Sequence, residues 1–205
     1  MIRLNAPEGI AVWQLELDSA IPLDCLSPDE EDRAARFRFA RDRHRYRACR
    51  SALRLVLGEA LRIAPEAVVF TYGPYGKPEC ALIFNVSHSA GLALIALGAD
   101  GVDIEKIRQD IEPKTLGRSV FTATELAAIT TTEDFFDAWT AKEALIKAEG
   151  GGFSSPLLKR TVWPTLEPEL AAHYDVVRLT PEPGFAGALA IRQAKKAARR
   201  VSGGS

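Results

Sequence analysis

Gly98-Ala-Asp-Gly-Val-Asp-Ile-Glu105 lies near the middle of this 205-residue chain and determines how the rest is divided. Its first four residues have the composition of a turn, and Val102 to Ile104 is typical of a short strand. On both sides of it, helical spacing is followed by apolar strands. We therefore predict an α+β fold of two pseudo-symmetric subdomains, residues 1–98 and 99–205, each with helices packed on a small antiparallel sheet.

In the first half, alternating apolar residues over 11–17 predict a strand. Ser27-Pro28-Asp29-Glu30 predicts a helix that begins after the cap Ser27, with helical spacing continuing, with interruptions, to about Ile63. Further strands are expected at 68–72, 82–86 and 92–97, with a glycine-proline turn at 73–78.

In the second half, the spacing from Pro113 to Ala148 is helical, with Thr122 and Thr132 as expected caps. The glycines at 150–152 should end the last helix. Late strands are expected at 174–179 and 187–191, and a flexible basic tail from about residue 195.

Composition indicates a globular protein: 47% of residues are apolar and the net charge is −1. No apolar run approaches the ~20 residues of a membrane helix, and the N-terminus lacks a signal-peptide stretch, so we expect a cytoplasmic protein with no membrane partner. The three cysteines, Cys25, Cys49 and Cys80, show no metal or disulfide spacing and are interpreted as reduced structural thiols.

Arginines are concentrated between residues 33 and 54, where only Asp42 opposes them (Arg33, Arg36, Arg38, Arg41, Arg43, Arg45, Arg47, Arg50 and Arg54). Two interpretations are open: a solvated face neutralised by the acids at 29–32, or a surface that attracts phosphate. Nucleic acid is not an expected partner, because the rest of the chain is not basic.

Two motifs carry carboxylates at functional spacing. Asp103 and Glu105 are two apart on a predicted strand, so both point to one face and form a half-site for a hard cation such as magnesium. Trp139, Glu143 and Lys147 are four apart on a predicted helix and lie along one side of it. Taken alone, the first pattern is also typical of a strand with a solvated face and the second of an ordinary surface pair.

Two further segments carry polar groups. Ser87 and His88 end an apolar strand, but adjacency in sequence does not make them a hydrolase dyad, and the chain has no Gly-x-Ser-x-Gly elbow. In the turn Tyr75-Gly76-Lys77-Pro78, glycine allows the backbone to approach a ligand closely and Lys77 supplies a cation.

The series Gly-Lys-Pro (76–78), Phe-Asn-Val-Ser-His-Ser (84–89), Gly-Val-Asp-Ile-Glu (101–105), Phe-Thr-Ala-Thr-Glu (121–125) and Trp-x-x-Lys-Glu-Ala-x-x-Lys (139–147), followed by glycines, closely resembles the signature of the surfactin-synthetase-activating phosphopantetheinyl transferases. The resemblance spans about residues 28–155. It implies a monomer whose two subdomains bind coenzyme A in the cleft between them.

The resemblance also implies roles. Magnesium, for which manganese can substitute, would be held by Asp103, Glu105 and Glu143, and Lys147 would lie near the phosphates as an active-site lysine. The coenzyme A contacts would be Arg33, Gly76, Lys77, Pro78, Ser87 and His88. Glu30 and Tyr46 depart from the family pattern at positions where some members have a cation and a threonine. The surplus Arg43, Arg45, Arg47 and Arg50 are candidates to compensate.

The implied reaction is attack by a serine of an apo acyl or peptidyl carrier protein on the β-phosphorus of coenzyme A, releasing 3′,5′-ADP. Glu143, or a water molecule on the metal, would take the serine proton. Alternatives are a metal-dependent phosphohydrolase or nucleotidyl transferase, and a non-catalytic module that binds carrier protein or coenzyme A. The sequence does not name the pathway served, whether fatty acid, polyketide or nonribosomal peptide.

A candidate carrier-binding surface lies in Pro113 to Phe121. Carrier proteins generally present an acidic, partly apolar helix beside their serine, so Leu116 and Arg118 are the expected contacts. Phe121 is expected to face the core instead.

Overall fold

The computed structural model describes residues 1–19, 24–73, 76–152 and 155–193. The strands are β1 (Ile2–Leu4), β2 (Ala11–Glu16), β3 (Thr71–Tyr72), β4 (Pro78–Glu79), β5 (Phe84–Ser89), β6 (Leu92–Leu97), β7 (Gly101–Lys106), β8 (Tyr174–Leu179) and β9 (Phe185–Arg192). The α-helices are α1 (Pro28–Ala35), α2 (Ala40–Leu61), α3 (Pro113–Gly117), α4 (Ala123–Ala128), α5 (Thr132–Glu149) and α6 (Pro168–Ala171), and short 3-10 helices cover Pro65–Ala67 and Pro156–Lys159. The tail expected from residue 195 lies outside the described residues.

Two antiparallel sheets form the centre of the molecule, and a two-stranded pair, β3-β4, lies apart from them. The first sheet has the order β1-β2-β6-β5, so all its strands precede Gly98. The second has the order β7-β9-β8, so all its strands follow Asp100. The predicted α+β class with small antiparallel sheets is confirmed.

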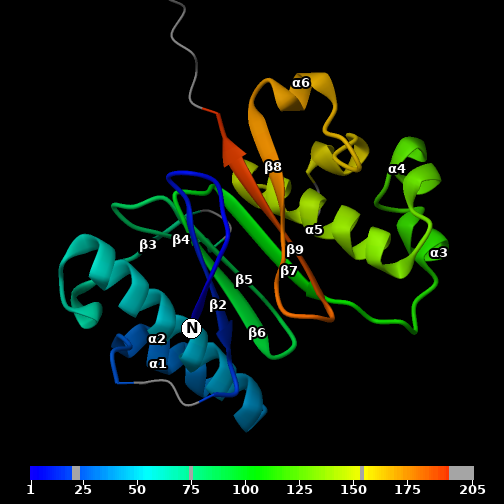
Figure 1. The fold of residues 1–205 in the computed structure, drawn as a ribbon. Coiled ribbons are helices and arrows are strands. Elements are labelled where there is room, and N and C mark those ends of the chain that lie inside the picture. Colours follow the sequence, from blue (N-terminus) through cyan, green and yellow to red (C-terminus); the bar gives the residue numbers. More distant parts are fainter. Residues whose placement is uncertain (20–23, 74–75, 153–154, 194–205) are drawn as a thin grey trace, which may run out of the picture.

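Side-chain alternation explains how the layers stack. On β6, Ala93 and Ile95 face α2, whereas Leu92 and Leu94 face the second sheet. On β9, Leu189 meets the first sheet, while the alanines on either side of it pack against α5. In Figure 1, α1 and α2 lie on one side of the sheets and α3 to α6 on the other.

The element boundaries confirm one expectation and correct two. The helical region near residues 28–63 is interrupted, as expected: it forms two helices, because the chain leaves helical geometry between Ala35 and Ala40. Thr131, not Thr132, caps α5: its hydroxyl accepts a hydrogen bond from the Asp134 amide. Only Thr71 and Tyr72 of the expected strand at 68–72 are extended and paired, since Pro65–Ala67 forms a 3-10 turn just before it.

Gly101 determines how closely β7 approaches α5. A Cβ atom built on Gly101 would lie 1.9 Å from the Ala144 carbonyl oxygen of α5. Only glycine fits there, and the contact brings the strand that carries Asp103 against the helix that carries Lys147. At the C-terminal end of α5, Gly150 adopts the left-handed conformation with φ 74° and ends the helix as expected. None of the described helices is both long and apolar enough to cross a membrane.

Candidate active site

The polar face of β5 lies against β7, the first strand of the other sheet. Asn85, Ser87 and Ser89 alternate on this face. The Val102 amide donates to Asn85 Oδ1 at 3.0 Å, Ser87 Oγ donates to Asp103 Oδ1 at 2.8 Å, and Ser89 Oγ donates to Glu105 Oε2 at 2.7 Å. These three bonds join the two halves of the chain and orient both carboxylates. Asn85 and Ser89 were not among the expected site residues, although both stand at period-two spacing from Ser87.

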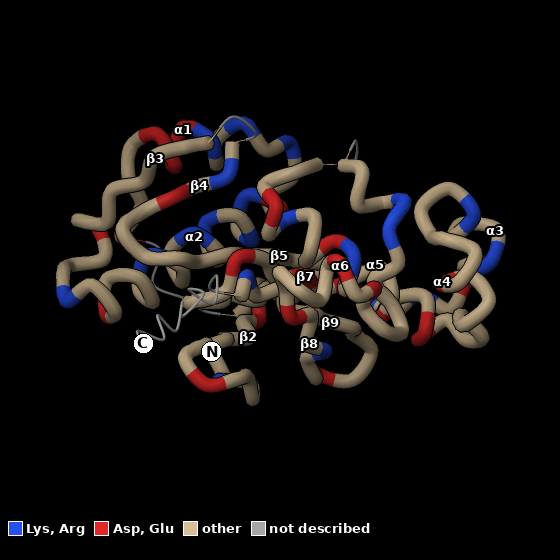
Figure 2. The backbone as a smooth tube through the Cα atoms, turned by 90° about the horizontal axis from the view of Figure 1, so that it is seen from above, with Lys and Arg blue, Asp and Glu red and all other residues tan. Residues whose placement is uncertain are grey.

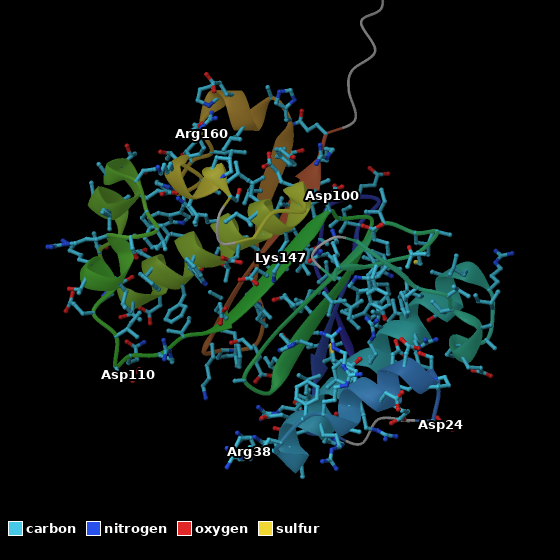
Figure 3. The ribbon with its side chains drawn as sticks, turned by 180° about the vertical axis from the view of Figure 1, so that it is seen from behind. Asp24, Arg38, Asp100, Asp110, Lys147 and Arg160 are labelled. Atoms are coloured by element: carbon cyan, nitrogen blue, oxygen red, sulfur yellow. The ribbon has the colours of Figure 1, made fainter. Side chains whose placement is uncertain are left out.

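Lys147 is the third component of this cluster. From α5, its Nζ donates to Asp103 Oδ1 at 2.6 Å, to Ser87 Oγ at 2.9 Å and to the Val102 carbonyl oxygen at 3.2 Å. Figure 3 shows Lys147 near the middle of the molecule, beside the central strands. The structure therefore brings together Ser87, Asp103 and Lys147, which lie in three separate motifs.

Glu105 and Glu143 are two further carboxylates whose charges interact with that of Asp103. Burial raises the pKa of Glu143, and the negative charge of Asp103 raises it further. Burial also raises the pKa of Glu105, although the hydrogen bond from Ser89 opposes this. Trp139, Glu143 and Lys147 are the half-buried side of a mostly buried helix, as their spacing predicts.

The donor set fits a hard cation completed by outside ligands. Asp103 is 3% exposed, and its Oδ2 is a buried oxygen without a hydrogen-bond partner. Such an orphaned acceptor is costly unless something binds it. Within the described part of the chain, no group of three or more Asp, Glu, His or Cys side chains is arranged as a ready-made metal site. Magnesium does not require one, because water and phosphate oxygens usually fill much of its shell.

Ser87 and His88 point to opposite faces of β5. Ser87 faces Asp103 and is 7% exposed, whereas His88 lines a cavity of about 210 Å³ together with Arg45 and Tyr46 of α2. Loss of solvation of the imidazole ring is the main cause that lowers the pKa of His88, and the positive charges of Lys147 and Arg45 lower it further. The two residues therefore reach different parts of the site.

Lys77 lies at the junction of the two halves. Its Nζ donates to the Asp100 carbonyl oxygen at 3.1 Å, and Gly76 before it has a φ of 72°. Burial lowers the pKa of Lys77, and the positive charge of Lys147 contributes to that shift. Pro78 pairs with Tyr72 in the β3-β4 ribbon, and Tyr75 lies outside the described residues.

Arg33 lies in a basic and aromatic recess of the first half. This cavity of about 600 Å³ is lined by Asp29, Arg33, Arg36, Phe37, Tyr46 and Tyr72. The Arg33 guanidinium lies 5.7 Å from the centre of the Tyr46 ring. Tyr46, a departure from the family pattern, therefore forms one wall beside Arg33.

Most of the surplus arginines are engaged by acids. Arg45 makes two hydrogen bonds to Asp18, at 2.8 and 2.6 Å. Arg47 pairs with Glu31 at 2.6 Å, while Arg50 and Arg54 both pair with the buried Glu30. Of the acids at 29–32, Glu30 and Glu31 therefore neutralise arginines as expected. Arg43 donates instead to the Phe37 carbonyl oxygen, at 3.3 Å.

A second recess, of about 540 Å³, adjoins the carboxylates. It is lined by Ser89 and Ala90 of the β5-β6 hairpin and by Glu105, Leu116 and Trp139. The remaining residues that line its wall are Lys106, Arg108, Val120, Phe135 and Phe136. This recess spans elements of both halves. Of the three carboxylates, Glu105 is the one that lines it.

A buried ion pair that sequence analysis did not identify supports this wall. Lys142 and Glu125 are both 0% exposed, and their charged atoms lie 2.6 Å apart. Lys142 Nζ also donates to the carbonyl oxygens of Val120, Leu158 and Arg160. Both residues stand inside recognisable motifs, but neither pattern reveals that they meet.

The comparisons with known proteins agree across both halves. A family model described as 4′-phosphopantetheinyl transferase superfamily matches residues 100–174, and one described as 4′-phosphopantetheinyl transferase, N-terminal, matches residues 13–99. The 4′-phosphopantetheinyl transferase HetI of Nostoc sp. is 34% identical over 208 aligned positions, covering 90% of this chain and 88% of HetI.

Two further relatives align over shorter spans. The putative 4′-phosphopantetheinyl transferase slr0495 of Synechocystis sp. is 35% identical over 147 positions, covering 64% of this chain and 60% of the relative. The 4′-phosphopantetheinyl transferase Sfp of Bacillus subtilis is 29% identical over 145 positions, covering 64% and 63%. The chain belongs to the 4′-phosphopantetheinyl transferase superfamily.

Proposed function

We propose that this protein is a surfactin-type transferase that moves the 4′-phosphopantetheine of coenzyme A to a serine of an apo acyl or peptidyl carrier protein and releases 3′,5′-ADP. The observation that carries the proposal is the contact of Lys147 with Asp103 beside two further carboxylates, Glu105 and Glu143. This is a site for a charged pyrophosphate bound through a cation.

Coenzyme A would extend from the recess of α1 and α2 toward β7. Arg33 and Arg36 offer cations to its 3′-phosphate, and Tyr46 and Tyr72 offer aromatic surface to its adenine. His88 lies further along, and Lys77 approaches from the junction of the two halves. Ser87, held by Asp103 and Lys147, would orient the lysine beside the phosphates of coenzyme A.

Magnesium, or manganese in its place, would be held by Asp103, Glu105 and Glu143 and would supply charge neutralisation of the pyrophosphate. The lysine adds to this field, because its ammonium can move from Asp103 to a phosphate oxygen without leaving the site. Glu143 lies one helical turn before Lys147 on the same side of α5. From there its carboxylate can accept the proton of the carrier serine as that oxygen attacks the β-phosphorus.

We further propose that the chain works as a monomer of two subdomains, 1–98 and 99–205. In support, the hydrogen bonds that assemble the site run between β5 and β7 of the same chain. Sedimentation of the active protein as a single chain is the expected result; activity confined to a trimeric species would contradict it.

The direct test is to incubate the protein with coenzyme A, Mg²⁺ and apo acyl and peptidyl carrier proteins and to weigh the carriers. A mass gain of one phosphopantetheine, dependent on Mg²⁺ and accompanied by 3′,5′-ADP, is expected. Hydrolysis of coenzyme A without any gain of carrier mass would instead identify a phosphohydrolase.

A further inference from the structure

The turn between α1 and α2 and the first turn of α2 carry an exposed group of one phenylalanine and three arginines that the proposed site does not use. We call Arg38, Phe39, Arg41 and Arg43 the elbow patch. All four are exposed, and the Phe39 side chain is 59% accessible. Figure 3 shows Arg38 at the edge of the molecule, away from Lys147, and Figure 2 shows arginines recurring along α1 and α2.

Phe39 serves neither the core nor the helix it precedes. It occupies the N-cap position of α2, and its side chain makes no cap hydrogen bond. Ser, Thr, Asp and Asn are preferred there, and apolar caps cost about 1 kcal/mol of helix stability. Local rules of this kind are broken mainly where function requires it. The guanidinium of Arg38 lies 5.3 Å from the Phe39 ring centre, so the two side chains form one exposed unit.

The charge of the elbow patch is not neutralised by the fold. Among the described residues, the only carboxylate within 4.0 Å of its guanidinium groups is Asp42, 3.8 Å from Arg41 Nε. Further along the same helix, Arg45, Arg50 and Arg54 are each paired closely with acids. Residues 20–23, outside the described part, contribute no charge, since they are Ala, Ile, Pro and Leu.

The elbow patch lies at one end of a path to the carboxylates. Phe37 and Asp42, its immediate neighbours, line the cavity of about 210 Å³ that also contains His88 and Ala90. Ala90 in turn lines the recess of about 540 Å³ that contains Glu105 and Leu116. A protein seated over that recess can therefore touch the elbow patch on one side and α3 on the other.

We propose that the elbow patch is a docking surface for the acidic face of the apo carrier protein. The inference rests on the proposed function, which requires a carrier serine to enter the recess. Arginine and aromatic residues are the types enriched at protein interfaces, and three exposed arginines with one weakly placed acid, Asp42, complement an acidic surface. A carrier held here and at α3 contacts both halves of the chain.

The test uses the double variant Arg38→Glu/Arg41→Glu, with Arg62→Glu as matched control. Arg62 is exposed at the opposite end of α2, about 33 Å away at the helical rise of 1.5 Å per residue. We expect the double variant to raise the KM for an apo acyl carrier protein about tenfold, with kcat and the KM for coenzyme A unchanged. Phe39→Ala should raise the carrier KM several-fold while leaving the unfolding temperature unchanged or higher.

Two further readouts separate docking from other roles. The carrier KM of the wild type should rise with ionic strength, and that of the double variant should respond much less. Binding of an apo carrier whose serine is replaced by alanine is measured in parallel, so a failure of transfer itself leaves the docking test intact. Unchanged carrier binding and KM in the double variant would overturn the proposal, as would loss of affinity for coenzyme A alone or for a DNA oligonucleotide alone.

Discussion

The Nζ of Lys147 lies 2.6 Å from Oδ1 of Asp103, and the second oxygen of that carboxylate has no partner. The contact joins α5 to β7 across 44 positions of sequence. It holds the lysine where it balances one carboxylate charge and leaves Oδ2 as a buried acceptor without a partner. In the proposed reaction, Asp103 would be shared between Lys147 and the metal ion.

Replacing Asp103 by asparagine should abolish transfer, because it removes a proposed metal ligand and the partner of Lys147. Losing charge neutralisation should cost several kcal/mol of transition-state stabilisation, or roughly 100-fold or more in rate. The variant keeps the shape of the side chain, so thermal unfolding should remain cooperative. Lys147→Ala should slow transfer less completely.

Manganese binding checks the same residue without relying on activity. Electron paramagnetic resonance of Mn²⁺ titrated into the free protein should show weaker binding to Asp103→Asn than to the wild type. Asp175→Asn, an exposed aspartate on β8, is the control and should bind as the wild type does. Equal Mn²⁺ affinity in all three proteins would exclude Asp103 as a ligand.

The local sequence pattern predicted most helices and strands well, but it predicted the contacts between them poorly. The strand at 92–97 and the strand at 174–179 have their expected bounds. The first is a continuous apolar run that ends at a turn, and the second is rich in β-branched and aromatic residues. The edge strand β1 was missed: three residues with little burial give no periodic signal. The pairing of β5 against β7 depends on which sheets stack, and local spacing does not encode this.

The same distinction applies to the site. Each motif could be recognised, but the contacts among Ser87, Asp103 and Lys147 arise from tertiary packing at Gly101. Nor could the sequence show that Glu30, a departure from the family pattern, is a buried partner of two arginines. The Glu30 carboxylate neutralises Arg50 and Arg54 of α2 and does not contribute a cation to a phosphate site.

Lys142→Met should destabilise the fold strongly, because it leaves the Glu125 carboxylate buried and unpaired. The expected loss is about 3–5 kcal/mol of unfolding free energy, measured by urea unfolding. The double variant Lys142→Met/Glu125→Gln should recover part of this loss, since no buried charge remains. Recovery should stay incomplete, because three carbonyl oxygens lose their donor. Lys159→Met, at an exposed lysine nearby, should change stability little.

Cys49 should resist alkylation in the native protein. Burial raises the pKa of its thiol to about 12, so at about pH 8 only roughly one molecule in 10⁴ is thiolate. Burial also raises the pKa of Cys25. Iodoacetamide labelling followed by peptide mass mapping should therefore find Cys80, the least buried of the three, modified first. Rapid native labelling of Cys49 would show that α2 opens readily.

Asp134 should stabilise α5 in a pH-dependent way. Partial burial acts to raise its pKa, but hydrogen bonds from Thr130 and Thr131 outweigh this, so the pKa lies below the ordinary 3.8. Because the pKa is lower in the folded protein, Asp134 contributes its full stabilisation at pH values above the ordinary pKa. This stabilisation is lost as the pH falls through the lowered pKa of the folded state. Asp134→Ala should cost about 1 kcal/mol near neutral pH, and the difference in urea midpoint should shrink in acid. A constant difference across that range would contradict the role of the ionised carboxylate.

Leu116 and Arg118 should bind the carrier from the side opposite the elbow patch. Leu116 is 47% exposed and lines the recess beside Glu105, whereas Phe121 is 7% exposed and belongs to a core cluster, as its pattern predicted. Arg118 lines a separate groove of about 730 Å³ with Lys159 at its rim. Truncating either side chain removes apolar or charged contact with the carrier but none with coenzyme A, so only the carrier KM should rise, by several-fold. Steady-state kinetics of Leu116→Ala and Arg118→Ala with both substrates would measure this, with Phe121→Ala expected to lower stability instead. An unchanged carrier KM in both surface variants would exclude α3 as a docking element, because neither residue supports the core.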